Sequence, residues 1–113
     1  MCGRFSLTTD LNKLQQSFNL DEVPPVFAPR YNIAPSQPVA VIANDNPKKL
    51  TFFKWGLVPS WAKDPRIGSK MINARAETLE EKPSFRTAFK RRRCLIPADG
   101  FFEWAKRNGD KVP

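Results

Sequence analysis

Residues 39–57, VAVIANDNPKKLTFFKWGL, contain two apolar runs separated by a turn. The unbroken apolar run at 39–43 predicts a buried strand, and residues 50–57 predict a second strand that Pro59 ends. Side chains alternate along a strand, so Phe52 and Phe53 should lie on opposite faces. The Asn-Asp-Asn-Pro sequence between the runs has the composition of a turn.

The residues before this pair predict a helix and then an extended segment. Residues 8–20 have the pattern of a short amphipathic helix that Thr9 or Asp10 can cap. Its apolar positions recur at helical spacing: Leu11, Leu14 and Phe18. Residues 23–38 hold five of the eleven prolines, which favours an extended, loop-like segment.

The residues after the pair predict short helices. Thr78 and Glu81 match a capping box, and Pro83 excludes a long helix there. A helical turn from Ser84 would bury one apolar stripe, which consists of Phe85, Ala88 and Phe89.

The C-terminal part predicts further strands. Residues 94–96 form a candidate strand, 97–100 a turn and 101–106 its partner strand. Asn108-Gly109 is a strong hairpin signal, because type I′ turns need positive φ at both central residues. Few residues follow it, so we expect the N-terminal part of a larger domain.

The composition fits one small domain. The 113 residues are 41% hydrophobic, with nine Phe and three Trp, which is enough apolar material for a core. Eleven Pro and five Gly favour many turns over long helices. The expected fold class is α+β, mostly β, with antiparallel strands and short helices.

The charge is strongly positive. Nineteen Lys and Arg face eleven Asp and Glu, for a net charge of +8, which favours polyanions. Six of these residues form an acid-free basic cluster: Lys82, Arg86, Lys90, Arg91, Arg92 and Arg93. Such a cluster indicates either a nucleic-acid surface or an ordinary solvated face.

The cysteine and histidine content limits the chemistry. Two cysteines, Cys2 and Cys94, and no histidine leave too few ligands for a zinc or iron–sulfur site, so we expect no metal and no cofactor. A Cys2–Cys94 disulfide is possible by count. The first residues lack the apolar core of a signal peptide, and the run at 39–43 is too short to span a membrane. We therefore expect an intracellular, cytoplasmic protein with free thiols.

Cys2 is the most informative residue. A small second residue allows removal of Met1, which leaves an α-amine and a thiol on adjacent carbons. An α-amine with a pKa of about 8 is partly neutral at pH 7 and can attack an aldehyde. The thiol can then close a five-membered thiazolidine ring. The alternative is an incidental small residue after the initiator.

Three further polar residues are candidates for a site. If the backbone is extended, Asn73 and Arg75 share one side, where an amide and a guanidinium could hold a sugar-phosphate. Glu103 alternates with Phe101 and Ala105, so an apolar face would desolvate it and raise its pKa. The alternatives are ordinary surface polar residues and an edge-strand Glu that faces water.

Aromatic residues and prolines could stack on unpaired bases. The set is Pro35, Trp55, Trp61 and Trp104. Such residues more often belong to a core, and Trp55, inside an apolar strand, fits that role. Trp61, in a loop, is the better stacking candidate.

Five segments resemble the SOS response-associated peptidase (SRAP) family, in the order in which the family carries them. They are MCGRF at 1–5, RYNIAP at 30–35, WGLVPSW at 55–61, NARAET at 73–78 and RCLIPADGFFEW at 93–104. They cover nearly the whole chain, so residues 1–113 are expected to be the N-terminal part of a single SRAP-type domain.

The resemblance implies a positively charged groove for single-stranded DNA, and covalent capture of abasic sites through Cys2 as a thiazolidine. It implies that Asn73 orients Cys2 and the sugar and that Glu103 assists imine formation. It also implies that Arg4 and Arg75 contact phosphates. Further DNA-packing positions are implied at Pro35, Trp104 and, less securely, Trp61.

The family's name refers to an autopeptidase activity that removes the residues before its cysteine, and the capture chemistry is lyase-like. The resemblance also implies a full-length monomer associated with the nucleoid. The family's catalytic histidine lies in the second half of its domain, and this sequence has none. Steps that need that histidine therefore have no candidate residue here.

Two other function classes share some of these features. N-terminal-nucleophile cysteine amidohydrolases also begin Met-Cys-Gly, and glutaminase turnover would identify one. A non-catalytic, basic single-stranded DNA-binding module would retain DNA only at low salt, without a covalent product.

Overall fold

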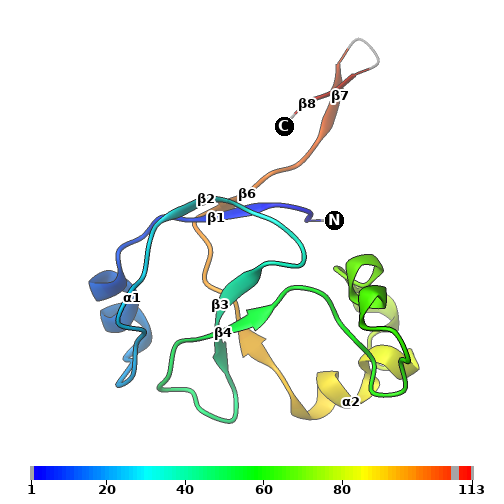
Figure 1. The fold of residues 1–113 in the computed structure, drawn as a ribbon, viewed down its shortest axis with the longest axis horizontal. Helices are drawn as coiled ribbons and strands as arrows, with labels where there is room; N and C mark the ends of the chain where they lie inside the picture. The colour runs from blue at the N-terminus through cyan, green and yellow to red at the C-terminus, as the bar shows by residue number, and fades with distance from the viewer. Residues whose placement is uncertain (1, 108–109, 113) are drawn as a thin grey trace.

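Two small antiparallel sheets form the centre of the molecule in the computed structural model, which describes residues 2–107 and 110–112 (Figure 1). The first sheet has the order β2-β1-β6 and the second β4-β3-β5. Their strands are β1 (Phe5–Leu7), β2 (Arg30–Ile33), β6 (Gly100–Phe101), β3 (Pro38–Ala43), β4 (Thr51–Lys54) and β5 (Cys94–Leu95). With two short α-helices, this confirms the mostly β, α+β fold.

The strand pair expected within residues 39–57 is confirmed. β3 and β4 pair antiparallel with Val39 opposite Phe53 and Ala40 opposite Phe52. β4 is shorter than expected and ends at Lys54. This register places Phe52 and Phe53 on opposite faces of the sheet, as the alternation predicts.

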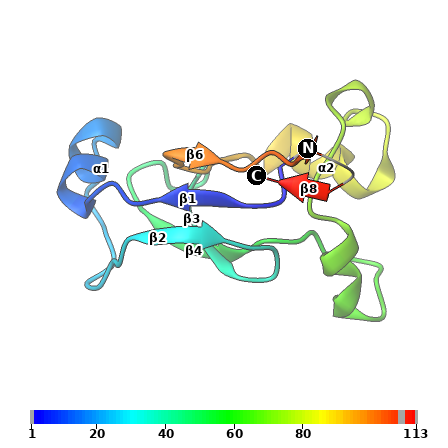
Figure 2. The ribbon, with the colours of Figure 1, turned by 90° about the horizontal axis from the view of Figure 1, so that it is seen from above.

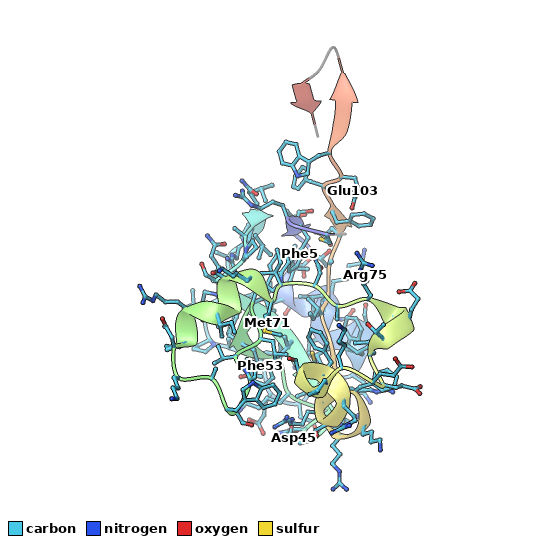
Figure 3. The ribbon with its side chains drawn as sticks, turned by 90° about the vertical axis from the view of Figure 1, so that its right-hand side faces the viewer. Phe5, Asp45, Phe53, Met71, Arg75 and Glu103 are labelled. Carbon is cyan, nitrogen blue, oxygen red and sulfur yellow. The ribbon has the colours of Figure 1, made fainter. Side chains whose placement is uncertain are left out.

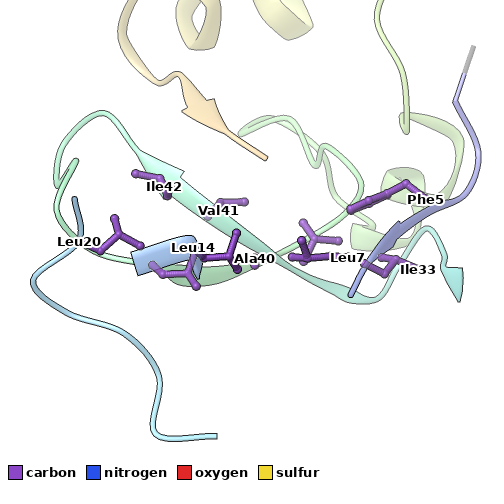
Figure 4. Packing of buried hydrophobic residues seen from close by; sticks show 10 residues of the cluster. Phe5, Leu7, Leu14, Leu20, Ile33, Ala40, Val41 and Ile42 are labelled. Carbon is purple, nitrogen blue, oxygen red and sulfur yellow. The ribbon is translucent and has the colours of Figure 1, made fainter. Parts of the chain in front are cut away.

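The core lies between the two sheets and helix α1 (Leu11–Phe18), as Figure 4 shows. Its buried members are Phe5, Leu7, Leu14, Leu20, Ile33, Val39, Ala40, Val41, Ile42 and Leu50. The predicted cap is confirmed at Asp10, whose carboxylate accepts the Lys13 backbone N–H at 2.9 Å. In Figure 2, α1 lies at one end of the stacked sheets.

The segment expected to be only an extended loop contains β2. This strand pairs with β1, with Phe5 opposite Ile33. Its four residues include a buried Ile33 but show no alternation of apolar and polar residues. The sequence pattern therefore did not predict this strand, and the surrounding prolines favoured a loop.

The capping box at Thr78 and Glu81 is wrong as a helix start. Thr78 ends a 3₁₀ turn (Ala76–Thr78), and helix α2 (Pro83–Arg91) begins at the proline itself. Proline suits the first turn of a helix because its missing N–H has no partner there. The expected buried stripe is only half-buried, at Phe85, Ala88 and Phe89.

The pairing expected for residues 101–106 is also wrong. β5 pairs with β3, whereas β6 pairs with β1 in the other sheet. The chain therefore crosses between the sheets at 96–99 instead of turning back. Asp99 anchors this crossing: its carboxylate accepts the backbone N–H and hydroxyl groups of Thr8 and Thr9.

The final strands, β7 (Ala105–Arg107) and β8 (Asp110–Val112), pair antiparallel and project from the rest of the chain in Figure 1. The expected turn residues, Asn108 and Gly109, lie outside the described residues. None of the helices in the described part of the chain has the length and apolar character that crossing a membrane requires.

Candidate functional site

Cys2 lies three residues before the start of β1 and is half-buried. Its thiol donates to the Arg4 carbonyl at 3.4 Å, and the Asn73 side-chain N–H donates to the Cys2 carbonyl at 2.7 Å. The thiol is free, as is that of Cys94. The contact with Asn73 fixes the backbone of residue 2 from a segment seventy-one positions away.

Asn73 reaches Cys2 because its segment is tied to the end of β4. The Trp55 indole N–H donates to the Ile72 carbonyl at 2.8 Å. Gly56 has φ of +134°, and a Cβ there would lie 2.6 Å from the Gly68 carbonyl oxygen. Only glycine allows this close approach of the two backbones. Trp55 packs against the core, as the sequence predicts.

An open apolar cavity of about 760 Å³ lies beside Cys2. We call it the trough. Its lining includes all three residues expected to be catalytic: Cys2, Asn73 and Glu103. Its wall and floor are otherwise mainly hydrophobic, with Phe53, Val39 and Val41 from the β4-β3-β5 sheet and Ile96 and Phe101 from the crossing and β6.

Glu103 differs from the expectation in one respect. Its side chain is exposed, so the predicted burial against an aromatic face is wrong. The alternation with Phe101 and Ala105 breaks because residues 102–104 belong to no strand. Figure 3 shows Glu103 at the base of the projecting strands.

None of the positions implied for DNA contact lines the trough. Arg4 donates to the Asn32 side-chain oxygen at 3.0 Å. Arg75 is exposed and lines a separate shallow hollow, so the structure does not bring it into one cavity with Asn73. The exposed fractions of Trp61 and Trp104 are 61% and 53%.

Pro35 is held in a turn next to Trp55. The Gln37 N–H donates to the Ala34 carbonyl at 3.3 Å, and Ser36 has φ of +72°. Proline followed by a positive φ fits a type II turn. The Ser36 N–H donates to the Trp55 carbonyl at 2.9 Å, so the turn adjoins the strand end that also holds Asn73.

The basic cluster is exposed throughout. It runs from Lys82, directly before α2, through the helix to Arg93. The Asn44 side-chain N–H donates to the Arg91 carbonyl at 3.1 Å, which ties the end of α2 to the far end of β3. The cluster and Cys2 are therefore at opposite ends of β3. Within the cluster, the Arg93 guanidinium stacks on Phe89, 4.1 Å from the ring centroid.

Two supporting residues were not predicted from the sequence. Asn32 holds the Arg4 side chain, and Asp99 joins the residues after β1 to the start of β6. The hydroxyl of Thr9, with the N–H and hydroxyl of Thr8, lowers the pKa of Asp99 to about 2. In the sequence, Pro-Ala-Asp-Gly only indicates a turn.

Comparisons with known proteins agree on one family. The family model for SOS response associated peptidase (SRAP) matches residues 1–113. The abasic site processing protein YoqW of Bacillus subtilis (strain 168) is 51% identical over 109 residues, which cover 94% of this chain and 49% of YoqW. The abasic site processing protein HMCES of Xenopus tropicalis is 33% identical over 100 residues, which cover 77% of this chain and 30% of HMCES.

A solved structure from Bacteroides thetaiotaomicron superposes with a TM-score of 0.83 at 26% identity, covering 99% of this chain and 52% of that one. A solved structure from Bordetella bronchiseptica superposes with a TM-score of 0.76 at 26% identity, covering 99% of this chain and 55% of that one. The chain thus spans about half the length of these bacterial relatives. It belongs to the SOS response associated peptidase (SRAP) family.

Proposed function

We propose that this chain is the part of an abasic-site processing protein that links covalently to single-stranded DNA through Cys2. The observation that carries the proposal is the position of Cys2 on the trough, with the Asn73 amide on its carbonyl. The relatives named as abasic site processing proteins support the substrate class.

The chemistry balances with the groups at hand. Once Met1 is removed, the α-amine of Cys2 adds to the aldehyde of a ring-opened abasic site, and water leaves to give an imine. The Cys2 sulfur then adds to the imine carbon, and its proton passes to the nitrogen. The product is a thiazolidine, formed with loss of one water in total.

Asn73 and Glu103 have different roles in this proposal. Asn73 holds the Cys2 backbone, so the amine and the thiol are oriented before the sugar arrives. Glu103 lines the same trough, where its carboxylate can accept a proton from the nitrogen of the amine adduct and pass it to the departing hydroxyl, which leaves as water. Cys2 is also the nucleophile that we propose for the autopeptidase removal of Met1. The imine that its amine forms with the abasic site makes the capture reaction lyase-like.

DNA would lie across the rim of the trough. Arg4 and Arg75 supply charge for phosphates, and Trp61 and Trp104 expose ring surface for unpaired bases. Pro35 would pack against the DNA strand beside these residues. We propose a monomer in the full-length form, working with the nucleoid.

The test is incubation with a single-stranded oligonucleotide that carries one abasic site, followed by a denaturing gel. We expect a shifted band that Cys2→Ala abolishes and Cys94→Ala retains. Cys94 is the matched control because it also lines the trough, and burial raises the pKa of its thiol. Salt-sensitive retention without a shifted band would contradict the proposal, and glutaminase turnover would indicate an amidohydrolase instead.

A further inference from the structure

The basic cluster around helix α2 has no role in the proposed function. Arg86 and Lys90 lie four residues apart on α2, which places them on one face of the helix, and Lys82 at the N-cap extends the same line. We call these three residues the basic row. Phe85 and Phe89, on the other side of the helix, are half-buried. The basic row is therefore the solvent side of α2, and at 1.5 Å per residue it is about 12 Å long.

The charges of the basic row are not neutralised within the part of the chain that the structure describes. Ion pairs do form elsewhere, as between Arg66 and Asp64. Glu80 and Glu81 lie directly before the row, yet neither forms an ion pair with it. The chain as a whole carries a net charge of +8. Neighbouring cations that lack a protein partner favour phosphates, because phosphate binding releases counterions.

The surroundings of the basic row favour double-stranded over single-stranded nucleic acid. Surfaces for single strands add aromatic rings on which unpaired bases stack. Phe85 and Phe89 are half-buried, and the Arg93 guanidinium covers Phe89 at 4.1 Å from the ring centroid. The exposed indole rings of Trp61 and Trp104 lie on other segments. A row of cations without an open ring suits the phosphate backbone of a duplex, whose bases are already stacked on one another.

The basic row is also separate from the trough, whose lining includes no residue of α2. Asn44 ties the end of α2 to the far end of β3, a strand that is roughly 17 Å long at about 3.4 Å per residue. In Figures 1 and 2, α2 lies at the outer edge of the molecule, on the opposite side of the sheets from α1.

We propose that the basic row is a second nucleic-acid surface, which binds the phosphate backbone of duplex DNA without reading its sequence. Phosphate contacts of this kind position a protein on a duplex and carry no base information. A duplex bound there leaves the trough free, because the two surfaces share no residue. The proposal does not rest on the chemistry proposed for Cys2.

The test is fluorescence anisotropy of the chain on a blunt DNA duplex without abasic sites, over a series of salt concentrations. The variant carries Arg86→Gln and Lys90→Gln together. Two lost phosphate contacts should reduce the slope of log affinity against log salt by about 1.8 and weaken binding at least about tenfold at low salt. The matched control carries Lys13→Gln and Lys48→Gln, which remove the same charge from exposed positions on other segments and should leave the slope unchanged.

Two further measurements separate the basic row from the trough. The variant with Arg86→Gln and Lys90→Gln should bind a single-stranded oligonucleotide of the same length within about threefold of the wild type. Cys2→Ala should bind the duplex as tightly as the wild type. In the wild-type chain, bound duplex should protect Lys82 and Lys90, but not Lys13, from acetylation, which mass spectrometry measures without any substitution.

Four results would each overturn the proposal. They are no duplex binding by the wild type, equal losses in the two double variants, an equal loss on single-stranded DNA, and equal protection of Lys13 and Lys90. Duplex binding by a chain that forms no crosslink with abasic DNA would count against the proposed function alone.

Discussion

The two faces of β3 meet different surroundings, although both are apolar. On one face, α1 and the first sheet enclose Ala40 and Ile42 within the core. On the other face, Val39 and Val41 are also buried, but Phe53 stays half exposed at the open trough, which Cys2 and Asn73 also line. The enclosed side gives the chain its fold, and the chemistry that we propose lies on the open side.

The largest expected difference between these sides is in stability. Ile33→Ala removes a side chain that is 1% exposed and should lower the free energy of unfolding by about 2–5 kcal/mol. Phe53→Ala, in the trough, should cost less than about 1 kcal/mol, because half of its surface is already in water. Urea unfolding of both variants measures the difference, and equal losses would show that the trough is part of the core.

Asn73 extends the comparison of the two sides of β3 to the rate of crosslinking. Asn73→Ala removes the hydrogen bond to the Cys2 carbonyl and should slow crosslinking about tenfold, which corresponds to about 1.4 kcal/mol. Asn44→Ala is the control, since its amide makes a similar bond to the Arg91 carbonyl at the far end of β3. Single-turnover gel assays would contradict the assignment if both variants were equally slow.

Arg4 tests where DNA lies. Arg4→Ala should reduce the slope of log affinity against log salt by about one, as expected for one lost phosphate contact. Arg66→Ala should leave the slope unchanged, because the Arg66 guanidinium already pairs with Asp64 at 2.8 Å and Arg66 does not line the trough. Fluorescence anisotropy on an intact oligonucleotide gives both slopes, and an unchanged slope for Arg4→Ala would place the DNA elsewhere.

The smallest expected effect comes from Asp99, which joins the residues after β1 to the crossing between the two sheets. Its pKa in the folded chain is about 2, below the ordinary value of 3.8. Its stabilising contribution is therefore complete above pH 3.8 and is lost as the pH falls toward 2. Thermal midpoints of the wild type and Asp99→Asn should differ by a few degrees near pH 5 and converge near pH 2; a constant difference would argue against this ionised contact.

The sequence predicts the elements that local pattern determines. The β3–β4 pair follows from two apolar runs around a turn, and α1 follows from its spacing and the Asp10 cap. The partners of β5 and β6 do not follow from local pattern, because strands of two residues carry no alternation and take their register from distant segments. The strand nearest in the sequence, which we expected to be the partner of β5, was therefore the wrong partner.

The site shows the same division. Cys2, Asn73 and Glu103 were identified from the sequence, through local chemistry and a resemblance, and the structure brings all three to one cavity. The exposure of Glu103 agrees with the alternative of a Glu that faces water, although residues 102–104 belong to no strand. The contacts of Asp99 with Thr8 and Thr9 join residues about ninety positions apart, beyond any local signal.

The central claim is that Cys2 uses both its nitrogen and its sulfur, and counting thiols tests it most directly. The crosslinked product would be denatured, treated with iodoacetamide and weighed, before and after borohydride. A thiazolidine leaves Cys94 as the single alkylated cysteine and gains no mass from borohydride. Two alkylated cysteines, or the gain of two hydrogens on reduction, would show an open imine and contradict the account.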